Sequence, residues 1–96
     1  MGKNDILVLL RMYKGRCAGK YGINALGVFG SVARDQATGD SDVDIVVKME
    51  QPNLVTLSRI RLEIEEMVHT HVDIVHYRDT MNKLLKKRID EEAVYA

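Results

Sequence analysis

Apolar residues recur at helical spacing in two stretches of the chain, which predicts two amphipathic helices. The first helix is expected over about residues 5–20, with Asn4 or Asp5 as its cap and Gly19 and Gly22 at its end. Its buried stripe is expected to consist of Ile6, Leu10, Tyr13 and Cys17. The second helix is expected to run from a cap at Asn53 to about His69. Its apolar face is expected to consist of Leu57, Ile60, Ile64 and Met67.

Short segments rich in apolar residues alternate with these helices and predict three β-strands, at residues 23–29, 42–48 and 71–76. Gly30-Ser31 predicts a turn into a short helix over about residues 31–37, followed by a turn at residues 38–40. A last helix is expected from Asp79 or Thr80 to near the C-terminus. The order α-β-α-β-α-β-α predicts an α/β (α+β) fold in which helices flank a small mixed β-sheet.

The composition narrows the class of protein. A chain of 96 residues is long enough for a single domain, residues 1–96, with one hydrophobic core. The 14 basic and 14 acidic residues balance, so the chain lacks the broad positive field that drives general nucleic-acid binding. Its single cysteine excludes an internal disulfide and fits the reducing cytoplasm. The apolar run before Arg11 is too short for a signal sequence or a membrane span.

One tetrapeptide occurs twice, as residues 43–46 and 72–75, and each copy places an aspartate between β-branched residues. Because side chains alternate along a strand, Asp42 and Asp44 share one face. If the third strand pairs beside the second, Asp73 projects onto that same face. Three partly desolvated carboxylates repel one another unless a cation binds them, and carboxylates plus substrate phosphates are the ligands that Mg²⁺ prefers. Asp42, Asp44 and Asp73 therefore predict a magnesium site, which two ions can share.

A glycine turn upstream predicts the second half of the site. Gly30 permits close backbone approach at the end of the first strand, and the amide groups that follow favour a phosphate. Ser31 adds a hydroxyl donor, and Arg34 lies on the same side of the short helix. Taken singly, these residues are typical of an ordinary loop and a solvated surface, and an Asp-x-Asp pair is typical of a turn. Together they predict a triphosphate beside a metal.

The remaining polar residues favour structural interpretations. His69, His71 and His76 are expected to be surface or hydrogen-bonded histidines, because a zinc site needs more convergent ligands. The basic run on the last helix is expected first as a solvated face, then as a docking surface for an acidic partner, and only third as an RNA contact. This run consists of Lys83, Lys86, Lys87 and Arg88.

Gly30-Ser31-Val32-Ala33-Arg34, followed by Ser41-Asp42-Val43-Asp44-Ile45, resembles the signature of the polymerase-beta-type nucleotidyltransferase superfamily. The chain is most similar to the minimal nucleotidyltransferases (MNT) of prokaryotic MNT–HEPN toxin–antitoxin pairs, from its first helix to the ending Glu92-Ala93-Val94-Tyr95. One departure is Asp35, at a position where a glycine often follows the arginine. Its added negative charge would weaken nucleotide binding if it faced the phosphates, but not if it faced solvent.

The resemblance implies a role for each residue of the site. Asp42 and Asp44 would be the metal-binding pair, and Asp73 would orient the metal and deprotonate the incoming hydroxyl. Gly30 and Ser31 would hold the triphosphate, while Arg34 would support phosphate binding or the local fold.

The resemblance also implies a reaction. The chain would transfer AMP from Mg²⁺-bound ATP to a tyrosine hydroxyl of a HEPN ribonuclease toxin, and so act as an antitoxin. Met81, Val94 and Tyr95 are expected to be exposed and to contribute to the contact with that partner. Two alternatives stay open: a non-enzymatic antitoxin that neutralises its partner by binding, and a nucleotidyltransferase that acts on a small molecule or RNA.

Overall fold

A computed structural model of the chain describes residues 2–38 and 41–96, so part of the turn expected at residues 38–40 lies outside the described residues. Helices and strands alternate along the chain, and the predicted order is confirmed. The elements are α1 (Lys3–Tyr21), β1 (Ile23–Phe29), α2 (Gly30–Ala33), β2 (Val43–Met49), α3 (Leu54–Val68), β3 (Val72–His76), α4 (Lys83–Glu92) and β4 (Val94–Tyr95).

The strands form a mixed sheet in the order β3-β2-β1-β4. β1 runs antiparallel to both β2 and β4, while β2 and β3 are parallel. This confirms the predicted small mixed sheet, including the pairing of the second and third strands on which the predicted site depends. The sequence did not predict β4, a pair of residues that adds an edge to the sheet.

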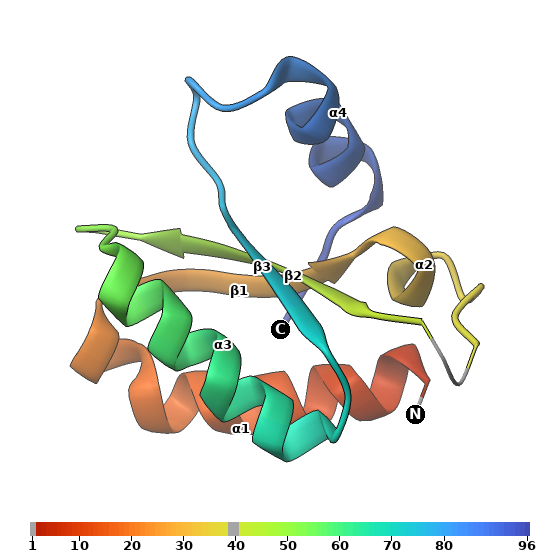
Figure 1. Cartoon of the computed structure of the whole chain (residues 1–96), viewed down its shortest axis with the longest axis horizontal. Helices are drawn as coiled ribbons and strands as arrows, with labels where there is room; N and C mark the ends of the chain where they lie inside the picture. Colours follow the sequence, from red (N-terminus) through yellow and green to blue (C-terminus); the bar gives the residue numbers. More distant parts are fainter. Residues whose placement is uncertain (1, 39–40) are drawn as a thin grey trace.

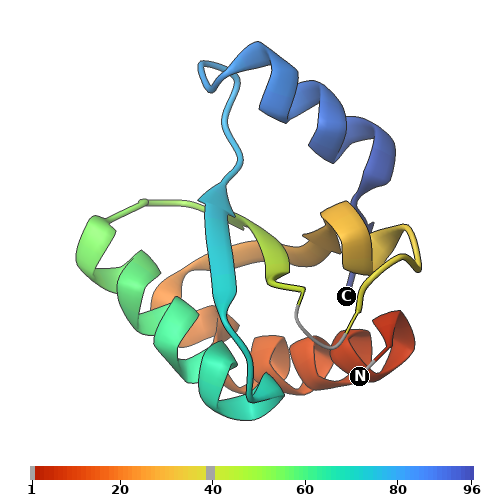
Figure 2. The same ribbon diagram turned by 45° about the vertical axis from the view of Figure 1, so that its right-hand side comes forward.

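Helices cover the sheet unequally on its two sides. In Figure 1, α1 and α3 lie together below the sheet, α4 lies above it, and α2 lies at one end. The turned view in Figure 2 shows the same arrangement, with α4 raised above the strands. In β2, Ile45 and Val47 pack into the larger core cluster with α1 and α3, whereas Val46 packs into a smaller one. The smaller cluster lies between the sheet and α4, and its buried members are Phe29, Val46, Met81 and Ile89.

Asparagine and glycine caps set several of the helix ends. Asn53 caps α3 as predicted, because its Oδ1 accepts the N–H groups of Val55 at 2.8 Å and Thr56 at 3.2 Å. The expected cap of the first helix at Asn4 or Asp5 was wrong. The helix begins earlier, at Lys3, and Asp5 accepts the N–H of Gly2 from within the first turn.

The first helix also runs past Gly19 to Tyr21, and Gly22 caps it in the left-handed conformation (φ 69°). The short second helix was expected to extend to residue 37 but ends at Ala33.

The segment before α4 differs most from the prediction. The last helix begins at Lys83 rather than at Asp79 or Thr80, because the Asn82 side chain accepts the N–H groups of the following turn. Met81 was expected to be exposed but is 6% exposed and packs in the small core cluster. The loop must bend before the helix to bury this side chain. Tyr95 is exposed as expected, and Val94 is half-buried in the sheet.

Among the residues that the structure describes, no helix combines the length and the apolar character that a membrane crossing requires.

Candidate active site

The pairing of β2 with β3 brings the predicted carboxylates together. Asp44 lies directly across from Asp73 in this parallel register, so the two side chains project from the same face of the sheet. Asp42 precedes β2 and places a carboxylate oxygen within 4.8 Å of an Asp73 oxygen. Asp44 is half-buried, whereas Asp42 and Asp73 are exposed. The cluster is therefore open to solvent on one side and rests on the sheet on the other.

Asp44 is the most buried of these three carboxylates. Burial, and next the neighbouring Asp73 carboxylate, raise the pKa of Asp44 above its ordinary value. Asp42 adds to this effect, and the guanidinium groups of Arg88 and Arg34 oppose it. The ionised form of Asp44 is thus disfavoured by its surroundings, which is the condition that a bound divalent cation would relieve.

His71 adjoins the carboxylate cluster. Its Nε2 lies 3.1 Å from Asp73 Oδ1 and its Nδ1 lies 3.2 Å from Glu65 Oε2. Glu65 also accepts the Val72 N–H at 2.9 Å, and this bond, with help from Arg61 and His71, holds the pKa of Glu65 below its usual range. The expectation of a hydrogen-bonded surface histidine is confirmed. Its place beside Asp42 and Asp73 was missed, although the alternation along a strand puts residue 71 on the face of residue 73.

Gly30 brings the turn after β1 against Asp44. Its backbone is left-handed (φ 73°), and a Cβ atom at this position would collide with Oδ2 of Asp44 and lie 3.1 Å from its Cγ. Any side chain would therefore both strain the backbone and displace the carboxylate. Ser31 follows in α2, half-buried, so the predicted turn residues do lie next to the predicted metal ligands.

The last helix supplies two charged side chains that sequence reasoning did not place in the site. Glu92 Oε2 accepts the Gly30 N–H at 3.1 Å, and Glu92 Oε1 accepts from Arg34 Nη1 at 2.9 Å. One turn earlier, the Arg88 guanidinium lies 5.9 Å from the centre of the Phe29 ring and lowers the pKa of Asp44. The pattern of the last helix predicted a solvated basic run first and a contact with a partner or RNA next, and none of these readings included the Gly30 turn. Contacts with residues 62 and 58 positions upstream leave no local signal.

The Asp35 side chain pairs with Lys3 and is not part of the carboxylate cluster. Its carboxylate pairs with Lys3 Nζ at 3.2 Å, and its side chain is 67% exposed. Its backbone is left-handed (φ 57°), a conformation in which glycine has no steric cost. This conformation gives a physical reason why a glycine would be favoured at this position.

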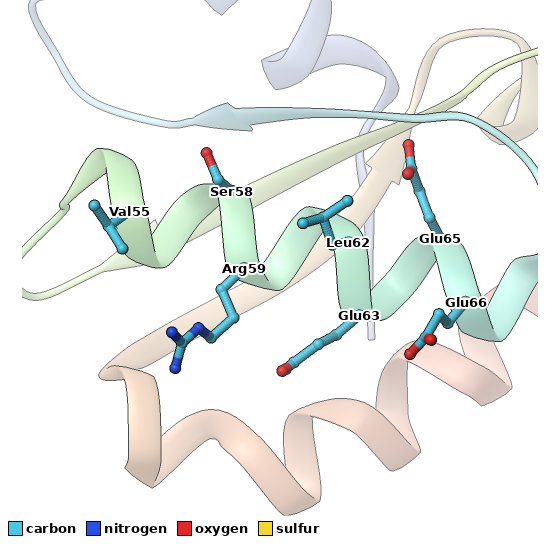
Figure 3. A pocket seen from close by; sticks show the side chains of 7 residues that line it. All are labelled: Val55, Ser58, Arg59, Leu62, Glu63, Glu65 and Glu66. Carbon is cyan, nitrogen blue, oxygen red and sulfur yellow. The ribbon is translucent and has the colours of Figure 1, made fainter.

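A surface hollow on α3 lies outside the carboxylate cluster. Figure 3 shows that every labelled side chain around it comes from α3, with Arg59, Glu63 and Glu66 directed toward α1 and Glu65 toward the sheet. None of the three aspartates lines it. The charged side chains of this hollow point in different directions, toward α1 and toward the sheet, so the carboxylate cluster remains the better candidate for chemistry.

Comparison with known proteins agrees with this geometry. A family model described as polymerase beta, nucleotidyltransferase, matches residues 14–95. The chain belongs to the polymerase beta nucleotidyltransferase family. All three aspartates, the Gly30-Ser31 turn and Glu92 lie within the matched residues.

Relatives of similar length align with most of this chain. The protein adenylyltransferase MntA of Thermococcus cleftensis is 32% identical over 92 residues, covering 95% of this chain and 92% of that protein. A protein of Methanocaldococcus jannaschii, named as a candidate protein adenylyltransferase, is 31% identical over 96 residues and covers 96% and 95% of the two chains.

Solved structures share the fold. That of a candidate minimal nucleotidyltransferase superposes with a TM-score of 0.77 at 32% identity, covering 98% of this chain and 95% of that one. A toxin–antitoxin crystal structure with AMP-PNP superposes with a TM-score of 0.73 at 19% identity, covering 99% and 72%. The resemblance to minimal nucleotidyltransferases is confirmed.

Proposed function

We propose that this nucleotidyltransferase transfers AMP from Mg²⁺-bound ATP to a tyrosine hydroxyl of a HEPN-type toxin and thereby acts as its antitoxin. The observation that carries the proposal is the placement of Asp73 across from Asp44 and within 4.8 Å of Asp42, with Gly30 packed against Asp44. Two relatives that are 31% and 32% identical to this chain over nearly their whole length are named as a candidate protein adenylyltransferase and a protein adenylyltransferase.

The donor chemistry of the cluster fits a hard divalent cation. Asp42, Asp44 and Asp73 offer carboxylate oxygens, the ligands that Mg²⁺ takes together with substrate phosphates. When bound, one or two Mg²⁺ ions would neutralise triphosphate charge and polarise the α-phosphate for displacement of pyrophosphate. In this proposal Asp42 and Asp44 hold the cation, and Asp73 orients it and accepts the proton of the attacking hydroxyl.

The turn after β1 would receive the triphosphate. The backbone N–H groups that follow Gly30 in α2 and the Ser31 hydroxyl are donors suited to phosphate oxygens, while the Gly30 N–H is bound to Glu92. Arg34, paired with Glu92, keeps the guanidinium charge beside this turn and supports its fold. Asp35 does not repel the nucleotide in this arrangement, because its carboxylate pairs with Lys3.

The choice of acceptor is motivated by the comparisons. A solved complex is described as a tri-AMPylated HEPN toxin of Shewanella oneidensis with its MNT antitoxin, and it shares the fold of this chain with a TM-score of 0.62 at 18% identity. An exposed carboxylate cluster suits a macromolecular acceptor, because a tyrosine on a docked protein can reach Asp73 from solvent. We expect the reaction in the cytoplasm, where the lone Cys17 stays reduced.

The experiment combines the chain with the HEPN-type protein encoded beside it, ATP labelled at the α-phosphate, and Mg²⁺. We expect label on a tyrosine of the toxin and loss of its ribonuclease activity. Asp42→Asn and Asp44→Asn should abolish both effects. The matched control is Asp79→Asn, whose side chain is 96% exposed and lies outside the cluster.

Other outcomes would replace the proposal. Neutralisation that survives in the Asp42 and Asp44 variants, without label, would show an antitoxin that works by binding alone. Label on RNA or on a small molecule, with none on protein, would show a nucleotidyltransferase with a different acceptor. Absence of label on every acceptor with the unaltered chain would remove the enzymatic proposal.

A further inference from the structure

One carboxylate from the end of α4 holds both ends of α2. Glu92 Oε2 accepts the N–H of Gly30, the first residue of α2, at 3.1 Å. Glu92 Oε1 accepts from the side chain of Arg34, the residue that caps α2 at its C-terminus, at 2.9 Å. The Glu92 side chain is only 20% exposed. A single acidic side chain therefore spans the whole of this short helix.

α2 needs such an external support. It contains four residues, Gly30–Ala33, which is about one turn. A helix of this length has almost no stability of its own, because nucleation costs more than one turn of hydrogen bonds returns. Its first residue is a left-handed glycine, the least restricted residue type. Charge-assisted hydrogen bonds to both ends would restrict it to one geometry.

The chain on either side of Glu92 is fixed. Before it, Ile89 is 1% exposed and packs in the small core cluster. After it, Val94 and Tyr95 pair with Val28 and Gly27 of β1. Gly27 makes this approach possible, since a Cβ atom there would lie 2.6 Å from the Val94 carbonyl oxygen. The packing of α4 and the pairing of β4 thus fix the position of the Glu92 carboxylate beside α2.

We propose that Glu92 is a positioning residue for nucleotide binding: it holds the Gly30-Ser31 turn and Arg34 in the geometry that receives the triphosphate, without touching the nucleotide itself. This inference rests on the proposed function of the same site and adds a residue to it. The negative charge of Glu92 is matched by the Arg34 guanidinium, so it does not repel the phosphates. A carboxylate that instead competed with the phosphates for Gly30 would have the opposite effect on affinity.

The test measures nucleotide binding directly, so that it does not depend on the acceptor. The probe is α,β-methylene-ATP with Mg²⁺, which cannot release AMP, titrated against the full chain by calorimetry. Glu92→Ala should raise the dissociation constant by about tenfold or more. Glu92→Gln keeps an acceptor for the Gly30 N–H and should raise it by less. The control is Glu91→Ala, an exposed neighbour on the same helix, which should bind as the unaltered chain does.

Two further readouts separate positioning from loss of the fold. The Gly30 amide should exchange its hydrogen faster in Glu92→Ala than in Glu92→Gln, while the amides of β2 keep their protection. Arg34→Ala combined with Glu92→Ala should cost less than the sum of the single changes, because each change removes the same contact.

Equal or tighter binding by folded Glu92→Ala overturns the positioning role, and tighter binding would identify Glu92 as a competitor of the phosphates. Failure of all the proteins, the unaltered chain included, to bind the probe would instead reject the nucleotide site and with it the proposed function.

Discussion

Individual residues set the electrostatics and the backbone geometry of the site. Asp44 is half-buried against the sheet and faces Asp73, while Gly30 leaves the space that its carboxylate fills. Asp35, a few residues after Gly30, takes a left-handed conformation that glycine would adopt at no steric cost.

The stabilising effect of Mg²⁺ should depend on pH through Asp44. Because its pKa is raised in the folded protein, the contribution of Asp44 to stability is present at low pH and is lost as the pH rises through that raised pKa. Mg²⁺ binds the ionised form, so the rise in Tm caused by excess MgCl₂ should be small near about pH 4 and larger near about pH 7. Differential scanning fluorimetry at a series of pH values measures this.

Asp44→Asn is the control for that titration. Without metal at neutral pH it should melt at a higher temperature than the unaltered chain, because a neutral amide replaces a disfavoured carboxylate. Its response to Mg²⁺ should also be much reduced. An equal Mg²⁺-induced shift at both pH values in the unaltered chain would contradict the role given to Asp44.

Asp35 provides a test of backbone strain. We expect Asp35→Ala to lower the free energy of unfolding by about 1 kcal/mol, because alanine is strained at a positive φ and cannot pair with Lys3. Asp35→Gly should remain within about 0.5 kcal/mol of the unaltered chain, since relief of strain offsets both the lost ion pair and the greater entropy of unfolded glycine. Urea denaturation of both variants measures the difference. Equal losses would mean that the ion pair, and not the backbone, decides this position.

At the scale of elements, the last strand and helix complete a site that the first three strands begin. β4 pairs with β1 through Tyr95 and Gly27, and α4 places Arg88 and Glu92 beside β1 and α2. The turn from α4 into β4 therefore couples the edge of the sheet to the Gly30-Ser31 turn. This coupling depends on the absence of a side chain at Gly27.

Gly27→Ala should displace β4. The added methyl group would overlap the Val94 carbonyl oxygen and the Tyr95 ring, so we expect a loss of about 1–3 kcal/mol in the free energy of unfolding. Amide hydrogen exchange should show lost protection in β4 and the end of α4 before the rest of the sheet.

The matched control is Gly19→Ala inside α1, where an added Cβ would have no atom of residues 2–38 and 41–96 within 4 Å beyond its chain neighbours and the backbone of the helix. That change should stabilise the protein by roughly 0.5–1 kcal/mol. Destabilisation by both substitutions would argue against a specific contact at Gly27.

At the scale of the whole molecule, the sheet separates two hydrophobic clusters with different tasks. The larger cluster joins the sheet to α1 and α3 and includes Ile60 and Ile64. The smaller cluster joins the sheet to α4 through Ile89, one turn before Glu92. Damage to the larger cluster should thus affect the whole fold, while damage to the smaller one should also affect the site.

Ile89→Ala and Ile64→Ala test this division. Both side chains are 1% exposed, so each truncation should cost about 2–4 kcal/mol in the free energy of unfolding. Only Ile89→Ala should also weaken binding of α,β-methylene-ATP at a temperature where both variants are folded, because it loosens the helix that carries Glu92. Similar affinities in the two variants would show that α4 does not control the site.

The amino-acid sequence by itself determined the features that repeat at short range. Helical spacing identified α1 and α3, and apolar segments identified β1, β2 and β3. Because side chains alternate along a strand, the spacing of two residues between Asp42 and Asp44 places them on one face. The position of Asp73 needed only one assumption about strand pairing. The fold class and the cluster of aspartates could therefore be predicted.

Only the tertiary structure decided which distant residues complete the site. The last helix was predicted as a basic surface run, but its Glu92 binds Gly30 and Arg34. His71 was predicted as a surface histidine, and it lies between Glu65 and Asp73. Met81 was expected to be exposed but is buried, because it packs in the small cluster between the sheet and α4. Periodicity reports which face of an element is apolar, but the packing of the whole chain determines what that face meets.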